Sequence, residues 1–188
     1  MNLWKVAFFT LAGAIVLAVA GIIYLAVADT EDVARPKPAE VEGNVITVQT
    51  TAKEFEAIAK QYLGDSLNKS PLPVEIEVND QIQLFSTLTV FGVDVPIAMD
   101  FEPVVDEGNI VLKQTAVNVG KLNIPPKTVL KLMQDSIDFP SWITVIPNDE
   151  EIFVDLSRIN IASGSRVRAK EIDLPNDHIV LEIVVPAE

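Results

Sequence analysis

Hydrophobic and polar positions divide the chain into one long apolar run, a short polar stretch and a long alternating region. Residues 6–28 form a run of 23 residues without a charge, most of them Ala, Val, Leu, Ile or Phe. A helix rises about 1.5 Å per residue, so this run would be roughly 35 Å long and would cross a hydrocarbon core of about 30 Å with some tilt. The pattern predicts a cytoplasmic stub and transmembrane anchor over residues 1–28.

Charges at the two ends of the apolar run predict its orientation. Lys5 and the N-terminal amine precede the run, whereas Asp29, Glu31 and Asp32 follow it. Because positive flanks tend to stay in the cytoplasm, we expect a single-pass protein of the cell membrane with its N-terminus inside and its main domain outside the cell. A cleaved signal peptide is the alternative, since residues 26–28 have the small-x-small form. The length of the run favours a retained anchor.

The polar stretch over residues 29–41 contains Pro36 and Pro38 and predicts a short, extended linker rather than folded structure. An extended chain of this length reaches about 40 Å, so the linker would hold the domain close to the membrane. The remaining residues, 42–188, have a normal length for one extracytoplasmic domain.

Two segments of this domain show helical spacing. Thr51 and Glu54 fit a capping box at the start of the first helix. Its apolar stripe at i, i+3, i+4, i+7 and i+8 consists of Phe55, Ile58, Ala59, Tyr62 and Leu63. The second helix begins at the proline pair 125–126 and ends before Pro140. Its stripe consists of Val129, Leu132, Met133 and Ile137.

Most of the remaining domain alternates apolar and polar residues at period two, which predicts antiparallel strands joined by short turns. In the strand predicted over residues 110–122, the apolar set changes phase at Gln114 and Thr115, which indicates a β-bulge or a sharp bend. The predicted fold class is α+β, with an N-terminal transmembrane helix followed by a long, curved antiparallel sheet packed with two helices.

Several strands carry apolar residues on both faces, and this leaves two interpretations of the sheet. Either helices cover one face and a loop covers part of the other, or the sheet curls around an apolar groove. A groove would suit a lipid, because burial contributes about 0.8 kcal/mol per CH₂ of an acyl chain. The residues expected to line it are Phe85, Phe91, Val117, Val119, Val129 and Met133.

Charge and composition exclude several functions. The chain has 27 acidic and 14 basic residues and a net charge of −13, which disfavours nucleic acid as a partner. It has no cysteine, so neither a disulfide nor a lipid-modified cysteine can form. Arg166, Arg168 and Lys170 alternate along one strand. They could contact a phosphate, but a charged face that blunts a sheet edge is the favoured interpretation.

The sequence contains no motif for a nucleophile, a phosphate-binding loop or a calcium loop. His178 is the only histidine, so a zinc cluster is not expected. The acidic residues 149–151 are expected to be solvated at a hairpin tip. We therefore predict no catalytic residue, cofactor or metal. An enzymatic function is the least favoured hypothesis and would depend on a single polar residue such as Asp155 or His178.

Four motifs together resemble a known family. They are T-x-x-E-F at 51–55, L-x-I-P-P-x-x-V-L-K-L at 122–132, W-I-x-V-x-P at 142–147 and V-D-L-S at 154–157. This combination, after an N-terminal apolar run, resembles the YpmS-like family of membrane-anchored proteins of Gram-positive bacteria. The resemblance implies an extracytoplasmic location and supplies no catalytic residues. The expected architecture is also similar to tubular lipid-binding domains, a likeness of fold alone.

Two functions follow as hypotheses. The first is a non-enzymatic, membrane-anchored domain that binds a lipid or a lipid-linked cell-envelope molecule in the apolar groove. The alternative is a structural or scaffolding protein that recruits cell-envelope enzymes through protein–protein contacts. The expected partners are thus the membrane, a lipid or lipid-linked precursor, and envelope proteins.

Overall fold

The computed structural model forms two compact units, Met1–Glu31 and Asp32–Glu188. It describes residues 8, 10–17, 20, 33–36, 43–90, 92–159, 161 and 164–186. In the first unit, the described residues are helical, and the rest of the predicted span 6–28 lies outside the described residues. Within the described ranges, no helix combines the length and the apolar character needed to cross a membrane. The transmembrane anchor therefore stays a prediction from the sequence.

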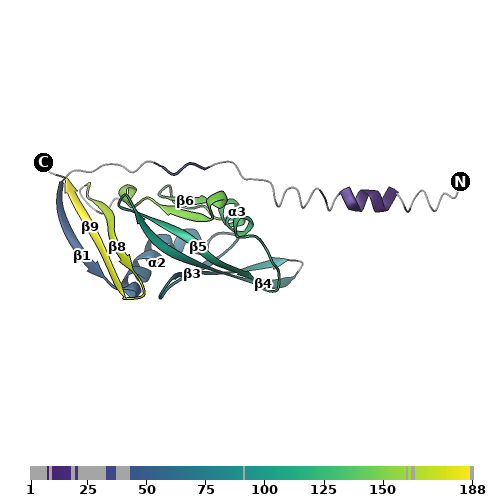
Figure 1. Ribbon diagram of the computed structural model, residues 1–188, viewed down its shortest axis with the longest axis horizontal. Helices are drawn as coiled ribbons and strands as arrows, with labels where there is room; N and C mark the ends of the chain where they lie inside the picture. The colour runs from purple at the N-terminus through teal and green to yellow at the C-terminus, as the bar shows by residue number, and fades with distance from the viewer. Residues whose placement is uncertain are drawn as a thin grey trace. The chain divides into compact units, whose positions relative to one another are not determined.

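The second unit has an α+β fold with large antiparallel sheets, which confirms the predicted class (Figure 1). Its elements in chain order are β1 (Gly43–Thr50), α2 (Ala52–Asn68), β2 (Val74–Val78), β3 (Ile82–Val90), β4 (Val93–Asp106), β5 (Asn109–Val119), α3 (Pro126–Ser136), β6 (Ile143–Ile146), η1 (Pro147–Asp149), β7 (Glu151–Val154), η2 (Leu156–Arg158), β8 (Arg166–Asp173) and β9 (His178–Pro186).

The strands form two sheets rather than the single long sheet that the sequence predicts. Strands β2-β3-β4-β5-β7-β6 make a six-stranded sheet, and β1-β9-β8 make a three-stranded sheet beside it (Figure 1). The two sheets meet where the Ala169 N–H on β8 donates to the Gly108 carbonyl in the β4–β5 turn, at 2.7 Å. The turn supplies a single carbonyl acceptor to β8 rather than a series of strand-to-strand hydrogen bonds. The two sheets are therefore in contact but do not form one continuous sheet.

The bulge expected in the strand from residue 110 is confirmed. The register of β4 against β5 shifts between Asp100 and Phe101 and leaves Thr115 as the extra residue. The Thr115 hydroxyl donates to the Asp100 carbonyl at 3.1 Å. Because of this extra residue, Leu112 before the bulge and Val117 after it both pack against the same core.

Helices α2 and α3 cover one face of the six-stranded sheet. Helix α3 buries Val129, Leu130 and Met133, and the middle of β4 buries Phe101 with 0% exposure. Helix α2 packs through Ala52, Phe55, Ala59, Leu63 and Leu67. Two members of its predicted stripe, Ile58 and Tyr62, are instead exposed. The packed face follows a spacing of three and four residues from Ala52, which leaves Ile58 and Tyr62 to one side of it.

The capping box at the start of α2 is confirmed. The Glu54 amide donates to the Thr51 hydroxyl at 3.3 Å, and the Thr51 amide donates to the Glu54 carboxylate at 3.2 Å. These bonds stabilise the ionised carboxylate, so the pKa of Glu54 is lowered, first by the Thr51 amide and then by the Thr50 and Thr51 hydroxyls. The helix begins with two of its free backbone donors satisfied.

Glu56 joins α2 to the first strand of the large sheet. Its carboxylate accepts a bond from the Val78 amide of β2 at 2.7 Å and one from the Lys60 ammonium at 2.7 Å. The Lys60 bond, followed by the Val78 bond, lowers the pKa of Glu56 from its ordinary value of 4.5. A lowered pKa in the folded state means that ionised Glu56 stabilises the fold at neutral pH, and that this contribution disappears as the pH falls through the lowered pKa.

We therefore expect Glu56→Gln to lower the free energy of unfolding at neutral pH by about 1 kcal/mol. The difference from the unmodified protein should shrink as the pH falls below 4.5. Urea unfolding at a series of pH values measures it. Glu77→Gln, at an exposed position of β2, is the control and should show no such convergence. If the stability difference between Glu56→Gln and the unmodified protein stayed constant down to acid pH, the lowered pKa of Glu56 would be contradicted.

Candidate functional site

The apolar face of β4 runs from the core to the protein surface. On this face Met99 and Ile97 are 1% and 2% exposed, Val95 is half-buried, and Val93 is 63% exposed. Leu88 on β3 lies opposite Val95 in the antiparallel register and is also half-buried. The same apolar surface that forms the core therefore continues to the β3–β4 turn and is open to solvent there.

The turn after β5 lies against β4 and leads to a further exposed apolar residue. The Gly120 amide donates to the Pro96 carbonyl of β4 at 2.9 Å, and a Cβ on Gly120 would lie 3.4 Å from a methyl of Val95. Gly120 has a φ of +55°, which favours glycine in this close turn. Leu122 follows two residues later and is 59% exposed. We call Leu88, Val93, Val95 and Leu122 the apolar end.

The structure describes five of the six residues predicted to line a groove. Val119, Val129 and Met133 are buried in the core, and Val117 is half-buried against the same core. Phe85 lies on the opposite face of β3, in register with Glu75 and Ala98. Phe91 lies outside the described residues. The structure thus brings four of the six together, as interior packing.

Sequence reasoning missed Val93 and Leu122 as surface residues. Val93 belongs to an unbroken alternation with Val95 and Ile97, and such a pattern alone predicts burial. Leu122 was included in a long strand, but β5 ends at Val119 and Leu122 lies beyond it. A signal for both was present in the neighbouring Gly92 and Gly120, which mark the turns where the chain leaves the covered face.

Asp155, named as a possible catalytic residue, holds a turn of the backbone. Its carboxylate accepts bonds from the Ser157 amide at 3.1 Å and from the Ser157 hydroxyl, and the Arg158 guanidinium lies 2.9 Å away. The Asp155 amide donates to the Trp142 carbonyl at 2.7 Å. With 1% exposure, this carboxylate caps η2 from inside the protein. The other candidate, His178, lies half-buried at the start of β9.

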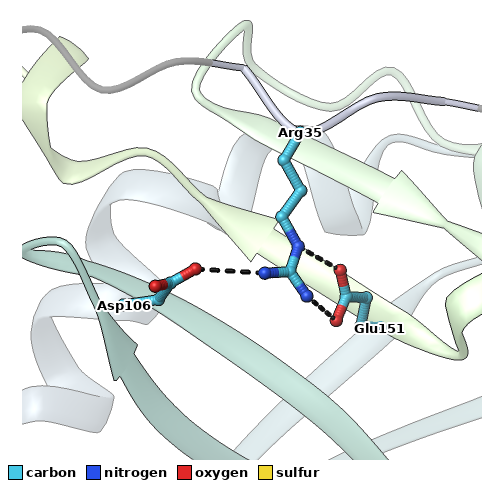
Figure 2. Close-up of polar contacts among 3 residues, drawn as sticks. All are labelled: Arg35, Asp106 and Glu151. Atoms are coloured by element: carbon cyan, nitrogen blue, oxygen red, sulfur yellow. Dashed lines mark hydrogen bonds and ion pairs between the residues drawn. The ribbon is translucent and has the colours of Figure 1, made fainter.

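Glu151 is not the solvated turn residue that the sequence predicts. It belongs to β7, is 3% exposed, and receives two bonds of 2.6 Å from the guanidinium of Arg35 (Figure 2). A third guanidinium nitrogen donates to the Asp106 carboxylate at 3.0 Å. The bonds to Glu151 and the nearby acidic charges raise the pKa of Arg35. We call Arg35, Asp106 and Glu151 the Arg35 clasp.

The clasp attaches part of the predicted linker to the folded domain. Beside Arg35, Val33 packs against Val111, Ile146 and Phe153. These three lie on the face of the large sheet that points away from the helices, since they alternate with core residues such as Leu112 and Ile152. Residues 33–36 of the predicted linker form no helix or strand, and a bidentate ion pair and an apolar contact hold them against the domain.

The basic residues of β8 pair with a carboxylate of the same sheet. Glu182 on β9 lies 2.7 Å from the Arg168 guanidinium and 3.2 Å from the Lys170 ammonium. The Arg168 bond is the main cause of a lowered pKa for Glu182. Strand β8 forms one edge of the three-stranded sheet, so this row places paired charges along a sheet edge.

Comparison with known proteins agrees with the resemblance seen in the motifs. The family model described as "Uncharacterized protein conserved in bacteria (DUF2140)" matches residues 2–185. The chain belongs to this family. The DUF2140 match includes both the apolar run and the folded domain. The chain is also 30% identical to "Uncharacterized protein YpmS" of Bacillus subtilis (strain 168) over 189 residues, which cover 100% of each chain. No solved structure matches.

Proposed function

We propose that this protein is a non-enzymatic, membrane-anchored domain that binds the acyl part of a lipid or of a lipid-linked cell-envelope molecule at the apolar end. One observation carries the proposal. Val93 is 63% exposed where the apolar face of β4 leaves the core, and Leu122, which pairs with Val119 beyond β5, is 59% exposed. An exposed apolar surface continuous with a core is typical of a binding site. Each CH₂ buried there would contribute about 0.8 kcal/mol.

The architecture supports the same proposal. A long antiparallel sheet with two helices on one face is the arrangement expected of a tubular lipid-binding fold, and β4 spans 14 residues. Four of the six predicted groove residues, Val117, Val119, Val129 and Met133, form the interior of this arrangement. An acyl chain would therefore enter from the apolar end and would reach Val117 only by displacing part of the packing around it.

The Arg35 clasp supports a location next to lipid. We propose that residues 6–28 anchor the chain with the main domain outside the cell. With Val33 packed against the domain beside the clasp, the chain from residue 28 to residue 33 can span at most about 17 Å. This tether is shorter than the roughly 40 Å expected for a free linker. A domain on such a tether would work at the bilayer surface, where its ligand is abundant.

The test uses the full chain purified in mild detergent. Native mass spectrometry would detect a co-purified lipid, and a fluorescent diacylglycerol would measure binding. We expect Val93→Glu and Leu122→Glu to weaken binding of this probe at least about tenfold, because each places a charge on the acyl contact. Ile58→Glu is the control, since Ile58 is a comparably exposed apolar residue on α2. Equal probe affinity in all three variants would refute the proposal.

The second candidate function is the recruitment of cell-envelope enzymes. It is favoured by Ile58 and Tyr62, which lie one turn apart on α2 and are 47% and 51% exposed. The same variants separate the two functions by cross-linking in cells. Loss of an enzyme partner with Ile58→Glu, but not with Val93→Glu, would favour recruitment over lipid binding.

A further inference from the structure

Strand β1 is an edge strand that is exposed on both faces. It pairs with β9 on one side only, and seven of its eight residues are exposed. Its apolar residues Val45, Ile46 and Val48 are 47%, 54% and 37% exposed. Along its free side, the backbone N–H and C=O groups have no partner strand among the residues that the structure describes.

The two edges of this small sheet differ in how they are protected. The β8 edge carries Arg168 and Lys170, has a bulge between Ala169 and Glu171, and donates the Ala169 amide to Gly108. The β1 edge has no charged residue and no proline, and its register with β9 runs through eight consecutive pairs without a shift. Charges, prolines and bulges are the features that keep strand edges apart. They protect β8 and are absent from β1.

The charge of this sheet identifies the partner that suits the open edge. The chain has a net charge of −13, which opposes contact between two copies over most of the surface. The three-stranded sheet is neutral, because its basic residues are balanced by an equal number of acidic ones. These residues are Arg166, Arg168, Lys170, Glu171, Asp173 and Glu182. A second copy can therefore meet β1 without like charges facing each other across the junction.

We propose that β1 pairs antiparallel with β1 of a second copy of this chain, which joins two three-stranded sheets into one six-stranded sheet. Such a contact is isologous, with the same residues supplied by both copies about a two-fold axis. The axis stands perpendicular to the joined sheet, so one residue near the centre of β1 faces its own counterpart. Because β1 runs from residue 43 to residue 50, that residue is Ile46 or Thr47.

Dimer formation would have a consequence for the apolar residues of β1. On each face of the joined sheet, the exposed side chains of one copy would lie opposite those of the other, so that Val45 and Val48 gain cross-strand neighbours. The contact also places two membrane anchors in one assembly. This inference is independent of lipid binding, since β1 and the apolar end are different surfaces.

The absence of cysteine from the chain makes the test direct. Single cysteines are introduced in turn at residues 45–49 of the full chain in detergent, and disulfide formation is followed under mild oxidation. We expect one sharp maximum, at Ile46→Cys or Thr47→Cys, and little cross-linking at Gln49→Cys. Gln49 would face residue 43 or 45 of the other copy, so two cysteines at 49 would be held apart. Thr89→Cys, exposed on β3, controls for random collision.

Sedimentation over a concentration series supplies the second readout. We expect Val45→Lys to weaken self-association at least about tenfold, because it places like charges on both sides of the two-fold axis. Circular dichroism checks that the variant is folded. A protein that stays monomeric throughout, or equal cross-linking at all five positions of β1, would overturn the proposal. Cross-links from β1 to a different protein in cells, with no β1–β1 product, would also overturn it.

Discussion

Phe101→Ala is expected to lower the free energy of unfolding by about 3–5 kcal/mol, the largest loss of any substitution considered for this domain. Phe101 is 0% exposed and lies beside the β-bulge, opposite Ile82 of β3. Truncation removes the buried ring and leaves a cavity between the sheet and the helices. Urea unfolding, followed by the fluorescence of Trp142, measures the loss.

Phe85→Ala is the matched control, because it removes the same ring from the neighbouring strand. Phe85 is half-buried on the opposite face of the sheet, so we expect a loss of about 1 kcal/mol. Equal losses of unfolding free energy at the two positions would mean that the helix-covered face is not the main core.

The same two substitutions also test the lipid proposal. A loss well below 3 kcal/mol for Phe101→Ala would indicate an interior loose enough to admit an acyl chain.

Arg35→Ala is expected to lower the free energy of unfolding by about 2 kcal/mol. The variant leaves the Glu151 carboxylate buried at 3% exposure without its two charged hydrogen bonds. Complete burial of the pair would predict a loss of about 3–5 kcal/mol, but Arg35 is 42% exposed and water compensates part of it. Release of residues 33–36 should also speed limited proteolysis of the segment before β1.

A control and a rescue separate the clasp from ordinary surface charge. Lys60→Ala removes a half-exposed cation from an i,i+4 ion pair with Glu56, and we expect a much smaller loss of stability than for Arg35→Ala, because water screens this pair. Glu151→Leu added to Arg35→Ala should restore stability while leaving residues 33–36 free, because no buried charge remains. Unchanged proteolysis in both Arg35 variants would show that the clasp does not hold the segment.

Local signals in the sequence predicted the elements well. Thr51 and Glu54 located the start of α2, and the proline pair 125–126 located the start of α3. The change of phase near Thr115 located the bulge of β5. Each of these features depends on residues within a few positions of one another, so the backbone geometry follows from nearby side chains alone.

Contacts between distant segments could not be predicted in the same way. Arg35 and Glu151 are separated by 116 residues, and nothing in the sequence near either one indicates the other. Glu151 directly follows Asp149 and Glu150, and a run of three acidic residues at a turn indicates solvent exposure. It is buried because β7 pairs with both β5 and β6 and because Arg35 reaches it from the N-terminal segment. The sequence could not separate Phe85 from Val117 for a similar reason, since the two alternate equally well in their strands but face opposite sides of the sheet.

The sequence by itself determined the family, the α+β class, the two helices, the bulge and the expectation of a membrane anchor, because periodicity, capping and turn chemistry act over short distances. Only the tertiary structure decided which apolar residues stay exposed. Val93, Ile58 and Val45 occupy patterns as regular as those of the core, yet they are exposed. Burial depends on which element lies opposite a residue, and that is set by strand order and helix placement across the whole domain. The apolar end, the Arg35 clasp and the open β1 edge all arise at this level.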